Sequence, residues 1–128
     1  MPYKVVIADK VDLIRDIFEN ALEQSEAYEL EASFSKPAQA VAYLAANNAD
    51  IAVINLVPGA GINGLEAAGK IKELKPEVKI IITASLPNAE DVEQARSIGV
   101  EGLWTVQADE KAFLDVMCRI MAGEKVYP

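Results

Sequence analysis

The sequence predicts an α/β fold in which one parallel β-sheet is covered by helices on both faces. Short apolar runs alternate regularly with amphipathic stretches of helical spacing, and this alternation is typical of a doubly wound parallel sheet. Three of the runs (VVIA, IAVI and III) are apolar throughout, as strands buried on both faces are. A chain of 128 residues can bury one such core without disulfides, so we expect a single domain.

Two strand–helix units are expected before the centre of the chain. A strand over 3–8 (YKVVIA) precedes a helix over 12–24 whose apolar residues lie at helical spacing. These residues are Leu13, Ile14, Ile17, Phe18, Ala21 and Leu22. A second strand over 28–35 alternates apolar and polar residues, and Pro37 can open the helix that continues over 38–48.

The central units have the most apolar strands. Residues 51–56 form a strand that is apolar except for Asn55, and a helix follows over 65–74. Residues 79–83 (KIIIT) form another apolar strand, and a helix follows over 90–98. These two strands therefore belong in the middle of the sheet.

The last unit consists of a short strand over 102–106 and a helix over 109–121, which Gly123 is placed to end. A short fifth strand and a half-polar second strand both suit the edges of a sheet. The sheet order 2-1-3-4-5, which is the flavodoxin-like order, satisfies these preferences. Trp104 is expected to pack on the edge strand or to lie in an interface.

The last predicted helix carries more apolar residues than one buried stripe requires. They are Phe113, Leu114, Val116, Met117, Ile120 and Met121. We expect an outward-facing member of this set to support self-association. The candidate surfaces are the first and last helices, and the fourth helix with the fifth strand. Cys118 is expected to be a buried, unreactive thiol.

The composition excludes several classes of function. The absence of histidine removes the usual general base and the commonest zinc ligand. A formal net charge of -8 argues against nucleic-acid binding by this segment. The single cysteine allows no intramolecular disulfide and favours a cytoplasmic location. No apolar run is long enough to span a membrane, and the start of the sequence lacks the pattern of a signal peptide.

Gly59, Gly61 and Gly64 form a G-x-G-x-x-G pattern after an apolar strand. Three features disfavour a dinucleotide-binding turn. Two complete strand–helix units precede the pattern, no carboxylate ends the next strand, and Pro58 removes an amide donor. A flavodoxin-like protein that binds a small ligand or nucleotide at this loop is the alternative reading.

Chemically distinctive side chains follow the ends of several predicted strands. Asp9, Lys10, Asn55, Thr83 and Val106 lie at the carboxyl ends of the first, third, fourth and fifth strands. In a sheet of this order, ligands bind near the carboxyl ends of the central strands. Each residue also has a plain structural interpretation: a turn residue, a solvated lysine, an amide that satisfies loop groups, or a strand residue.

The segments VVIADK, ADIAVINLVPGAGINGLEAAGKIKEL, KIIITAS and GVEGLWTV resemble, in order and spacing, the CheY-like receiver domain of bacterial response regulators. In that family two acidic residues hold Mg²⁺ and an aspartate accepts a phosphoryl group. A Ser or Thr and a lysine bind the phosphoryl oxygens. The ending IMAGEKVYP resembles receivers that continue into a helix-turn-helix, which implies a receiver over 1–122 and the start of a linker over 123–128.

Compared with that pattern, the site is degenerate. Asp9 and Thr83 match the family, whereas Lys10 replaces the second acid, Asn55 the acceptor, Val106 the lysine and Leu103 a switching aromatic. We expect no catalytic residue, no cofactor and weak or absent Mg²⁺ binding, with Asp9 at most a weak ligand. Lys10 is either solvated or an internal cation in place of the metal.

The resemblance also implies a role in two-component signalling. We expect a non-enzymatic receiver that controls an attached transcription-regulating domain through protein contacts, without phosphorylation. We expect the chain to form a homodimer. A histidine kinase or another regulatory protein is a further expected partner. DNA would be bound only through a domain outside this sequence, and no membrane is expected. A phosphorylation-competent receiver with an unusual acceptor is a further alternative.

Overall fold

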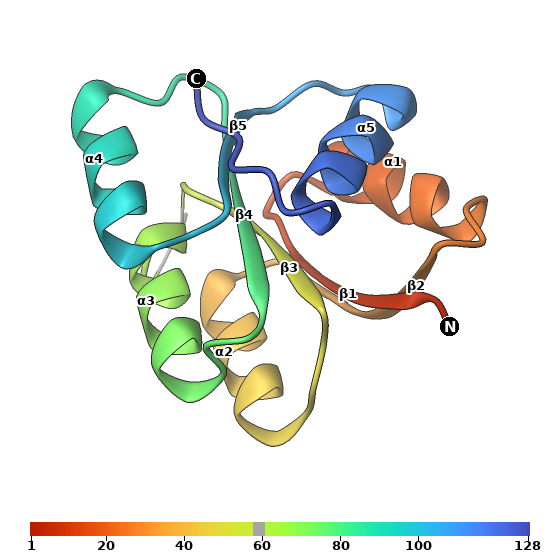
Figure 1. Ribbon diagram of the computed structural model, residues 1–128, viewed down its shortest axis with the longest axis horizontal. Coiled ribbons are helices and arrows are strands. Elements are labelled where there is room, and N and C mark those ends of the chain that lie inside the picture. The colour runs from red at the N-terminus through yellow and green to blue at the C-terminus, as the bar shows by residue number, and fades with distance from the viewer. Residues whose placement is uncertain (58–60) are drawn as a thin grey trace.

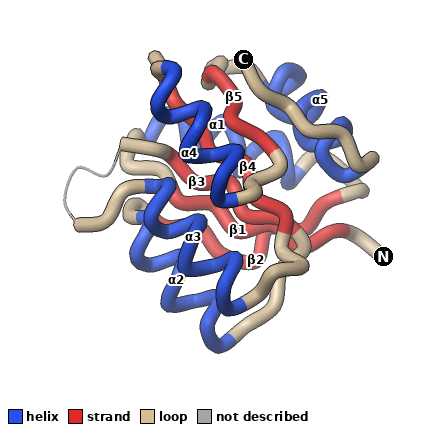
Figure 2. The backbone as a smooth tube through the Cα atoms, turned by 60° about the vertical axis from the view of Figure 1, so that its left-hand side comes forward, coloured by secondary structure: helices blue, strands red, loops and turns tan. Residues whose placement is uncertain are grey.

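The computed structural model describes residues 1–57 and 61–128, and it has the three-layer α/β architecture that the sequence predicts (Figures 1 and 2). Strands and helices alternate along the chain. The elements are β1 (Tyr3–Ala8), α1 (Asp12–Glu23), β2 (Tyr28–Phe34), α2 (Pro37–Ala46), β3 (Ile51–Asn55), α3 (Gly64–Leu74), β4 (Lys79–Ala84), α4 (Ala89–Ile98), β5 (Gly102–Thr105) and α5 (Glu110–Met121). The predicted elements are therefore confirmed, with small differences at their ends.

The sheet is parallel, and its strand order is β2-β1-β3-β4-β5, as predicted. The register aligns Ala8 of β1 with Ile54 of β3, and Asn55 of β3 with Thr83 of β4. Because all strands run the same way, the residues that follow β1, β3 and β4 meet at one edge of the sheet. The pairing register thus decides which side chains can form a site.

The helices divide between the two faces of the sheet. In Figures 1 and 2, α1 and α5 lie together on one face, and α2, α3 and α4 cover the other. Alternate residues of the central strands pack into one cluster or the other, as strand geometry requires. On the α1 and α5 side, the rings of Phe18 and Phe113 stack with centroids 4.1 Å apart, and Trp104 lies 6.2 Å from Phe18. Trp104 therefore packs on the edge strand.

Two of the three glycines in the G-x-G-x-x-G pattern have structural roles. Gly61 has φ +86°, a conformation that favours glycine. Gly64 opens α3 directly against the end of β3, where a Cβ would overlap the main-chain oxygen of Asn55 and lie 2.9 Å from Cα of Leu56. Gly59 lies outside the described residues. Close packing of α3 on β3 therefore explains why a larger residue is excluded at Gly64.

Some side-chain expectations were wrong. Cys118 is exposed, because it lies about 100° around α5 from the buried Met117. In the predicted apolar set of α5, Leu114 and Met121 are half-buried and the other members are buried, and the role of an outward-facing member in self-association stays a prediction. By contrast, Leu13 of α1 is 65% exposed although it belongs to the apolar pattern of that helix.

The residues after α5 fold back onto the domain. Gly123, with φ +98°, turns the chain, and Val126 forms a parallel bridge with Gly102 of β5. The Tyr127 hydroxyl donates to the main-chain oxygen of Val100, and the Arg96 guanidinium lies 4.2 Å from the centre of the Tyr127 ring. The predicted domain boundary after residue 122 stays a prediction, but these residues contact β5 and α4.

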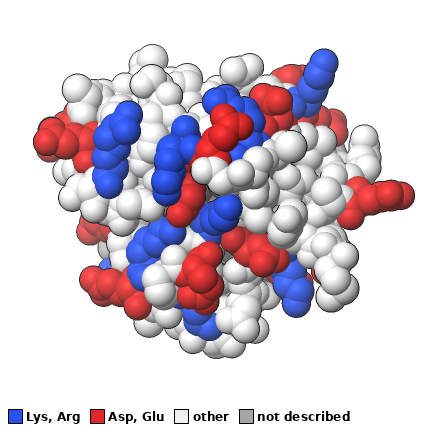
Figure 3. All heavy atoms as spheres, in the orientation of Figure 1, with Lys and Arg blue, Asp and Glu red and all other residues white. Residues whose placement is uncertain are grey.

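Surface charge is mixed on the face shown in Figure 3, where Lys and Arg side chains lie among Asp and Glu side chains and not in one basic patch. Within the described ranges, every helix is too short or too polar to cross a membrane.

The close approach of α3 to β3 predicts opposite effects of two glycine substitutions. Gly64→Ala should lower the free energy of unfolding by about 1–3 kcal/mol, because its methyl group meets the main chain of β3. Gly69→Ala, in the same helix, meets nothing within 4 Å and should raise it by up to about 1 kcal/mol through helix propensity. Urea denaturation of both variants measures the difference, and equal stabilities would contradict this account of Gly64.

Candidate functional site

The candidate site lies at the carboxyl edge of the sheet, where β1, β3 and β4 end. Asp9 follows β1, Asn55 ends β3, and Thr83 lies next to Asn55 in the register of β4. Asp9 is 2% exposed and Thr83 is fully buried, whereas Asn55 is half-buried. The structure therefore brings together three of the side chains that the sequence singles out.

Asp9 and Asn55 organise their loops in the same way. The amide of Val11 donates to Oδ1 of Asp9 at 2.9 Å, and the amide of Val57 donates to Oδ1 of Asn55 at 3.0 Å. Each side chain thus accepts from the amide two residues further on, which is the geometry of an Asx turn. On its other side, Nδ2 of Asn55 donates to Oγ1 of Thr83 at 3.4 Å, which is long for a hydrogen bond.

The second carboxylate oxygen of Asp9, Oδ2, is buried and accepts no hydrogen bond from the described residues. Burial raises the pKa of Asp9, and this effect exceeds the lowering by the Val11 amide, the Arg15 guanidinium, the Asn55 amide and Lys10. A buried carboxylate oxygen without a partner is costly, so the charged form of Asp9 destabilises the folded chain.

The nearest fixed cation is not Lys10. Lys10 is exposed, and of the four groups that lower the pKa of Asp9 it has the smallest effect. Arg15 of α1 instead donates from Nη1 to the main-chain oxygen of Asp9 at 2.7 Å, and from Nη2 to Oδ1 of Asp12 at 2.7 Å. Sequence reasoning missed Arg15, although a basic residue near a helix N-terminus opposes the helix dipole and so signals a local partner.

Val106 and Leu103 pack against the apolar clusters on the two faces of the sheet. Val106 donates its amide to the main-chain oxygen of Ala84 at 2.9 Å, and its side chain packs half-buried against the α1 and α5 cluster. Leu103 is fully buried in the cluster on the opposite side of the sheet. Neither side chain can supply the positive charge that a lysine after β5 would bring.

The residues of the site do not fit a Mg²⁺ ion. Mg²⁺ needs several hard oxygen ligands at short, nearly octahedral geometry. Asp9 supplies one free carboxylate oxygen, and Oδ1 of Asn55 already accepts the Val57 amide. Across the described part of the chain, no three His, Cys, Asp or Glu side chains are grouped so that they could hold a metal ion.

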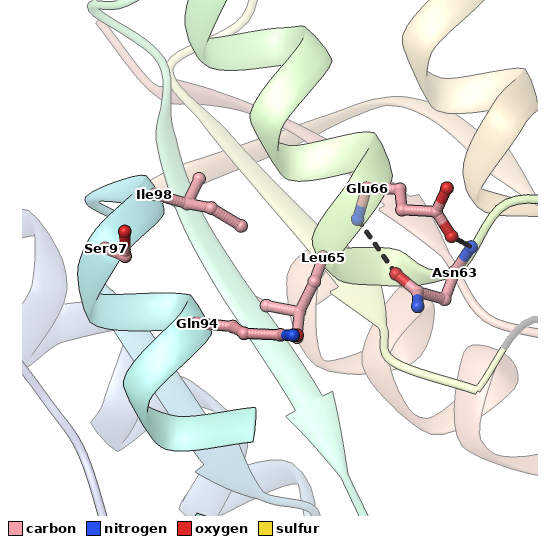
Figure 4. Close-up of a pocket in the computed structure, with 6 residues that line it drawn as sticks. All are labelled: Asn63, Leu65, Glu66, Gln94, Ser97 and Ile98. Carbon is pink, nitrogen blue, oxygen red and sulfur yellow. Dashed lines mark hydrogen bonds between the residues drawn. The ribbon is translucent and has the colours of Figure 1, made fainter. Parts of the chain in front are cut away.

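A separate groove lies between α3 and α4, with a volume of about 460 Å³ (Figure 4). It is lined by Asn63, Leu65, Glu66, Gln94, Ser97 and Ile98. Asn63 and Glu66 satisfy each other's main chain: Oδ1 of Asn63 accepts the Glu66 amide at 2.8 Å, and Oε1 of Glu66 accepts the Asn63 amide at 3.3 Å. These polar groups cap α3, so the groove has fewer free polar groups for binding a ligand than the carboxyl edge of the sheet has.

The chain is similar to two curated proteins. It is 27% identical over 121 residues to the oxygen regulatory protein NreC of Staphylococcus haemolyticus and 26% identical to NreC of Staphylococcus epidermidis. Each match covers 94% of this chain and 56% of the relative. The chain therefore spans about half the length of these relatives.

Solved structures with the same fold include the isolated REC domain of RcsB from Salmonella enterica serovar Typhimurium in the presence of BeF3⁻. It has a TM-score of 0.86 and 20% identity, over 100% of this chain and 94% of that one. A LuxR-family two-component response regulator from Aurantimonas sp. SI85-9A1 has a TM-score of 0.87 and 20% identity. This match covers 98% of this chain and 89% of that one. At these identities the structures show the fold alone.

The family model described as "Response regulator receiver domain" matches residues 5–117, which include every strand end of the candidate site. Since this match extends over most of the chain, and the strand order is the one that the fold requires, the chain belongs to the response regulator receiver domain family.

Proposed function

We propose that this chain is an atypical receiver that signals without phosphorylation. The observation that carries the proposal is the amide at the acceptor position. The Asn55 side chain is uncharged and a poor nucleophile, so it cannot form an acyl phosphate as a carboxylate does. Its oxygen is also occupied by the Val57 amide, and its nitrogen faces Thr83.

The charge of the site supports the same proposal. Three carboxylates and one lysine would give the site a formal charge of about −2 at neutral pH. Here Asp9 and Lys10 sum to zero, Asn55 and Val106 are neutral, and Lys10 is exposed. Phosphoryl transfer depends on positioning and on positive charge around the phosphoryl oxygens. A site with one buried carboxylate and too few acidic ligands for a metal ion can neither position a phosphoryl group nor surround its oxygens with positive charge.

Without a covalent signal, the receiver responds only to a partner that binds one of its conformations more tightly than another. We therefore assign it a regulatory role in the cytoplasm, through protein contacts that control an attached DNA-binding domain. The length of the NreC relatives, of which the match covers 56%, leaves room for such a domain in those proteins. A related structure is described as two RcsB dimers bound to two parallel DNAs, with a TM-score of 0.86 and 19% identity.

The partner with most support is a second copy of the chain. On α5, Leu114 and Met121 are the half-buried members of the apolar set, and α5 packs beside α1, which exposes Leu13. These side chains form the apolar part of the surface that we assign to a homodimer.

The first prediction tests the loss of phosphorylation. After incubation with acetyl phosphate and Mg²⁺, intact-mass spectrometry should detect no phosphorylated chain, and beryllofluoride should leave the NMR spectrum unchanged. The variant Lys10→Asp, Asn55→Asp, Val106→Lys restores the three family side chains and serves as the positive control, with an adduct expected. A stoichiometric adduct on the native chain would show that it is a phosphorylation-competent receiver.

The second prediction concerns Asp9 and pH. Because burial raises the pKa of Asp9 above its ordinary value of 3.8, the folded state binds this proton more tightly than the unfolded state. The resulting stabilisation is complete below the ordinary pKa and is lost as the pH rises through the raised one. Asp9→Asn should therefore raise Tm at pH 7, and the gain should shrink towards zero below pH 3.8.

Calorimetry of Asp9→Asn at several pH values provides the measurement for the second prediction, with Asp115→Asn on the exposed side of α5 as the control. Asp115→Asn should leave Tm nearly unchanged at every pH. A lower Tm for Asp9→Asn at pH 7 would mean that the carboxylate is compensated in solution.

The third prediction concerns self-association. Leu114→Glu places a charge in the apolar part of the proposed dimer surface and should shift the chain to a monomer in size-exclusion chromatography with light scattering. Lys111→Glu, at an exposed position of the same helix, should leave the dimer intact. If the native chain is already monomeric at high concentration, the dimer proposal is wrong.

A further inference from the structure

We propose that Arg15 is a built-in cation of the receiver site. Its guanidinium occupies a position on which three oxygen atoms converge, and it fixes the turn after β1 that carries Asp9. This inference rests on the proposed function, because a site that needs no Mg²⁺ for phosphoryl transfer can hold its loop with a permanent charge.

The contacts of Arg15 define this position. Nη1 donates to the main-chain oxygen of Asp9 at 2.7 Å, and Nη2 donates to Oδ1 of Asp12 at 2.7 Å. Nε lies 3.7 Å from Oε2 of Glu19. One planar guanidinium therefore faces a main-chain oxygen and two carboxylates, an arrangement for which arginine is better suited than lysine.

The turn after β1 is closed by the same residues. Oδ1 of Asp9 accepts the amide of Val11, and the main-chain oxygen of Val11 accepts the amide of Arg15 at 3.0 Å. Val11 is also the N-cap residue of α1, and its side chain makes no capping hydrogen bond. The helix therefore begins without the usual side-chain cap, and the Arg15 guanidinium ties its first turn to the end of β1.

The contacts continue to the edge of the sheet. Oε2 of Glu19 accepts the hydroxyl of Ser33 in β2 at 2.9 Å, so Arg15, Glu19 and Ser33 join the end of β1, helix α1 and strand β2. The Arg15 side chain is 20% exposed, and partly buried charges are screened less by salt than those at the surface. A network of this kind constrains geometry more than an isolated exposed pair does.

The charge of Arg15 also acts on Asp9. It lowers the pKa of the Asp9 carboxyl, and it does so more strongly than Lys10. It nevertheless binds the main-chain oxygen of Asp9 and leaves Oδ2 without a partner. Arg15 thus provides positive charge beside the acidic residue, which is the electrostatic part of what a bound cation would provide, and repels a divalent cation that approaches the same oxygens.

Replacing the guanidinium should uncover the oxygens around it. In Arg15→Ala, which keeps a residue of high helix propensity in α1, we expect Mn²⁺ to bind roughly tenfold more tightly than to the native chain. Paramagnetic broadening of amide signals at residues 9–12 measures this binding. Adding Asp12→Asn to Arg15→Ala should remove most of the gain, because it removes one of the converging carboxylates.

Two further variants separate charge from geometry. Arg15→Lys keeps the charge, so Mn²⁺ binding and the NMR titration of the Asp9 carboxyl should stay near native values. Lysine has one donor nitrogen in place of the two separate nitrogens that Arg15 directs at Asp9 and Asp12, so it holds the turn less firmly and amide exchange at Val11 should become faster. Arg119→Ala removes an arginine that pairs with Glu124 on the surface, and it should change none of these readouts.

The result that would overturn the inference is specific. If Arg15→Ala matches Arg119→Ala in Mn²⁺ binding, in the Asp9 titration and in exchange at Val11, Arg15 is only a surface residue of α1. Faster exchange at the central strand amides as well as at Val11 would also count against it, since that pattern reports general destabilisation. A native chain that forms a phosphoryl adduct would refute the proposed function, whichever result the Arg15 variants give.

Discussion

The in-register pairing of β1, β3 and β4 is the constraint on which the rest of the molecule depends. These strands are apolar on both faces, so each must be covered by helices on both sides, and they occupy the centre of the sheet. Their parallel alignment brings Asp9, Asn55 and Thr83 to one edge. A slip of one residue in either pairing would turn the buried side chains to the wrong face and would separate the site.

The site keeps the geometry of the receiver fold while its chemistry differs. Asp9 and Asn55 each close a loop by accepting the amide two residues on, which any side chain with a short acceptor can do. What has changed is charge. The acceptor position has an amide, the position after β5 has an apolar residue, and the fixed cation nearest to Asp9 comes from α1. In the function that we propose, the fold keeps the shape of these loops without phosphoryl chemistry.

The edge of the sheet at β5 is covered by the residues that follow α5. Residues after α5 return to β5, where the amide of Val126 donates to the main-chain oxygen of Glu101 and its oxygen accepts the amide of Leu103. Gly102 permits this approach, since a Cβ there would lie 3.3 Å from the oxygen of Val126. Pairing at this edge shields strand groups that would otherwise be open to other chains, and it links the end of the described chain to α4 through Tyr127.

The sequence by itself determined the element order, the central and edge strands, the sheet order and the polar residues at the strand ends. It could do so because the periodicity of apolar residues and the positions of glycine and proline are local properties. Only the tertiary structure decided that Lys10 points to solvent while Arg15 reaches Asp9, that Cys118 is exposed, and that Val126 pairs with β5. These outcomes depend on side-chain directions and on packing between distant segments, which the local periodicity of apolar residues does not specify.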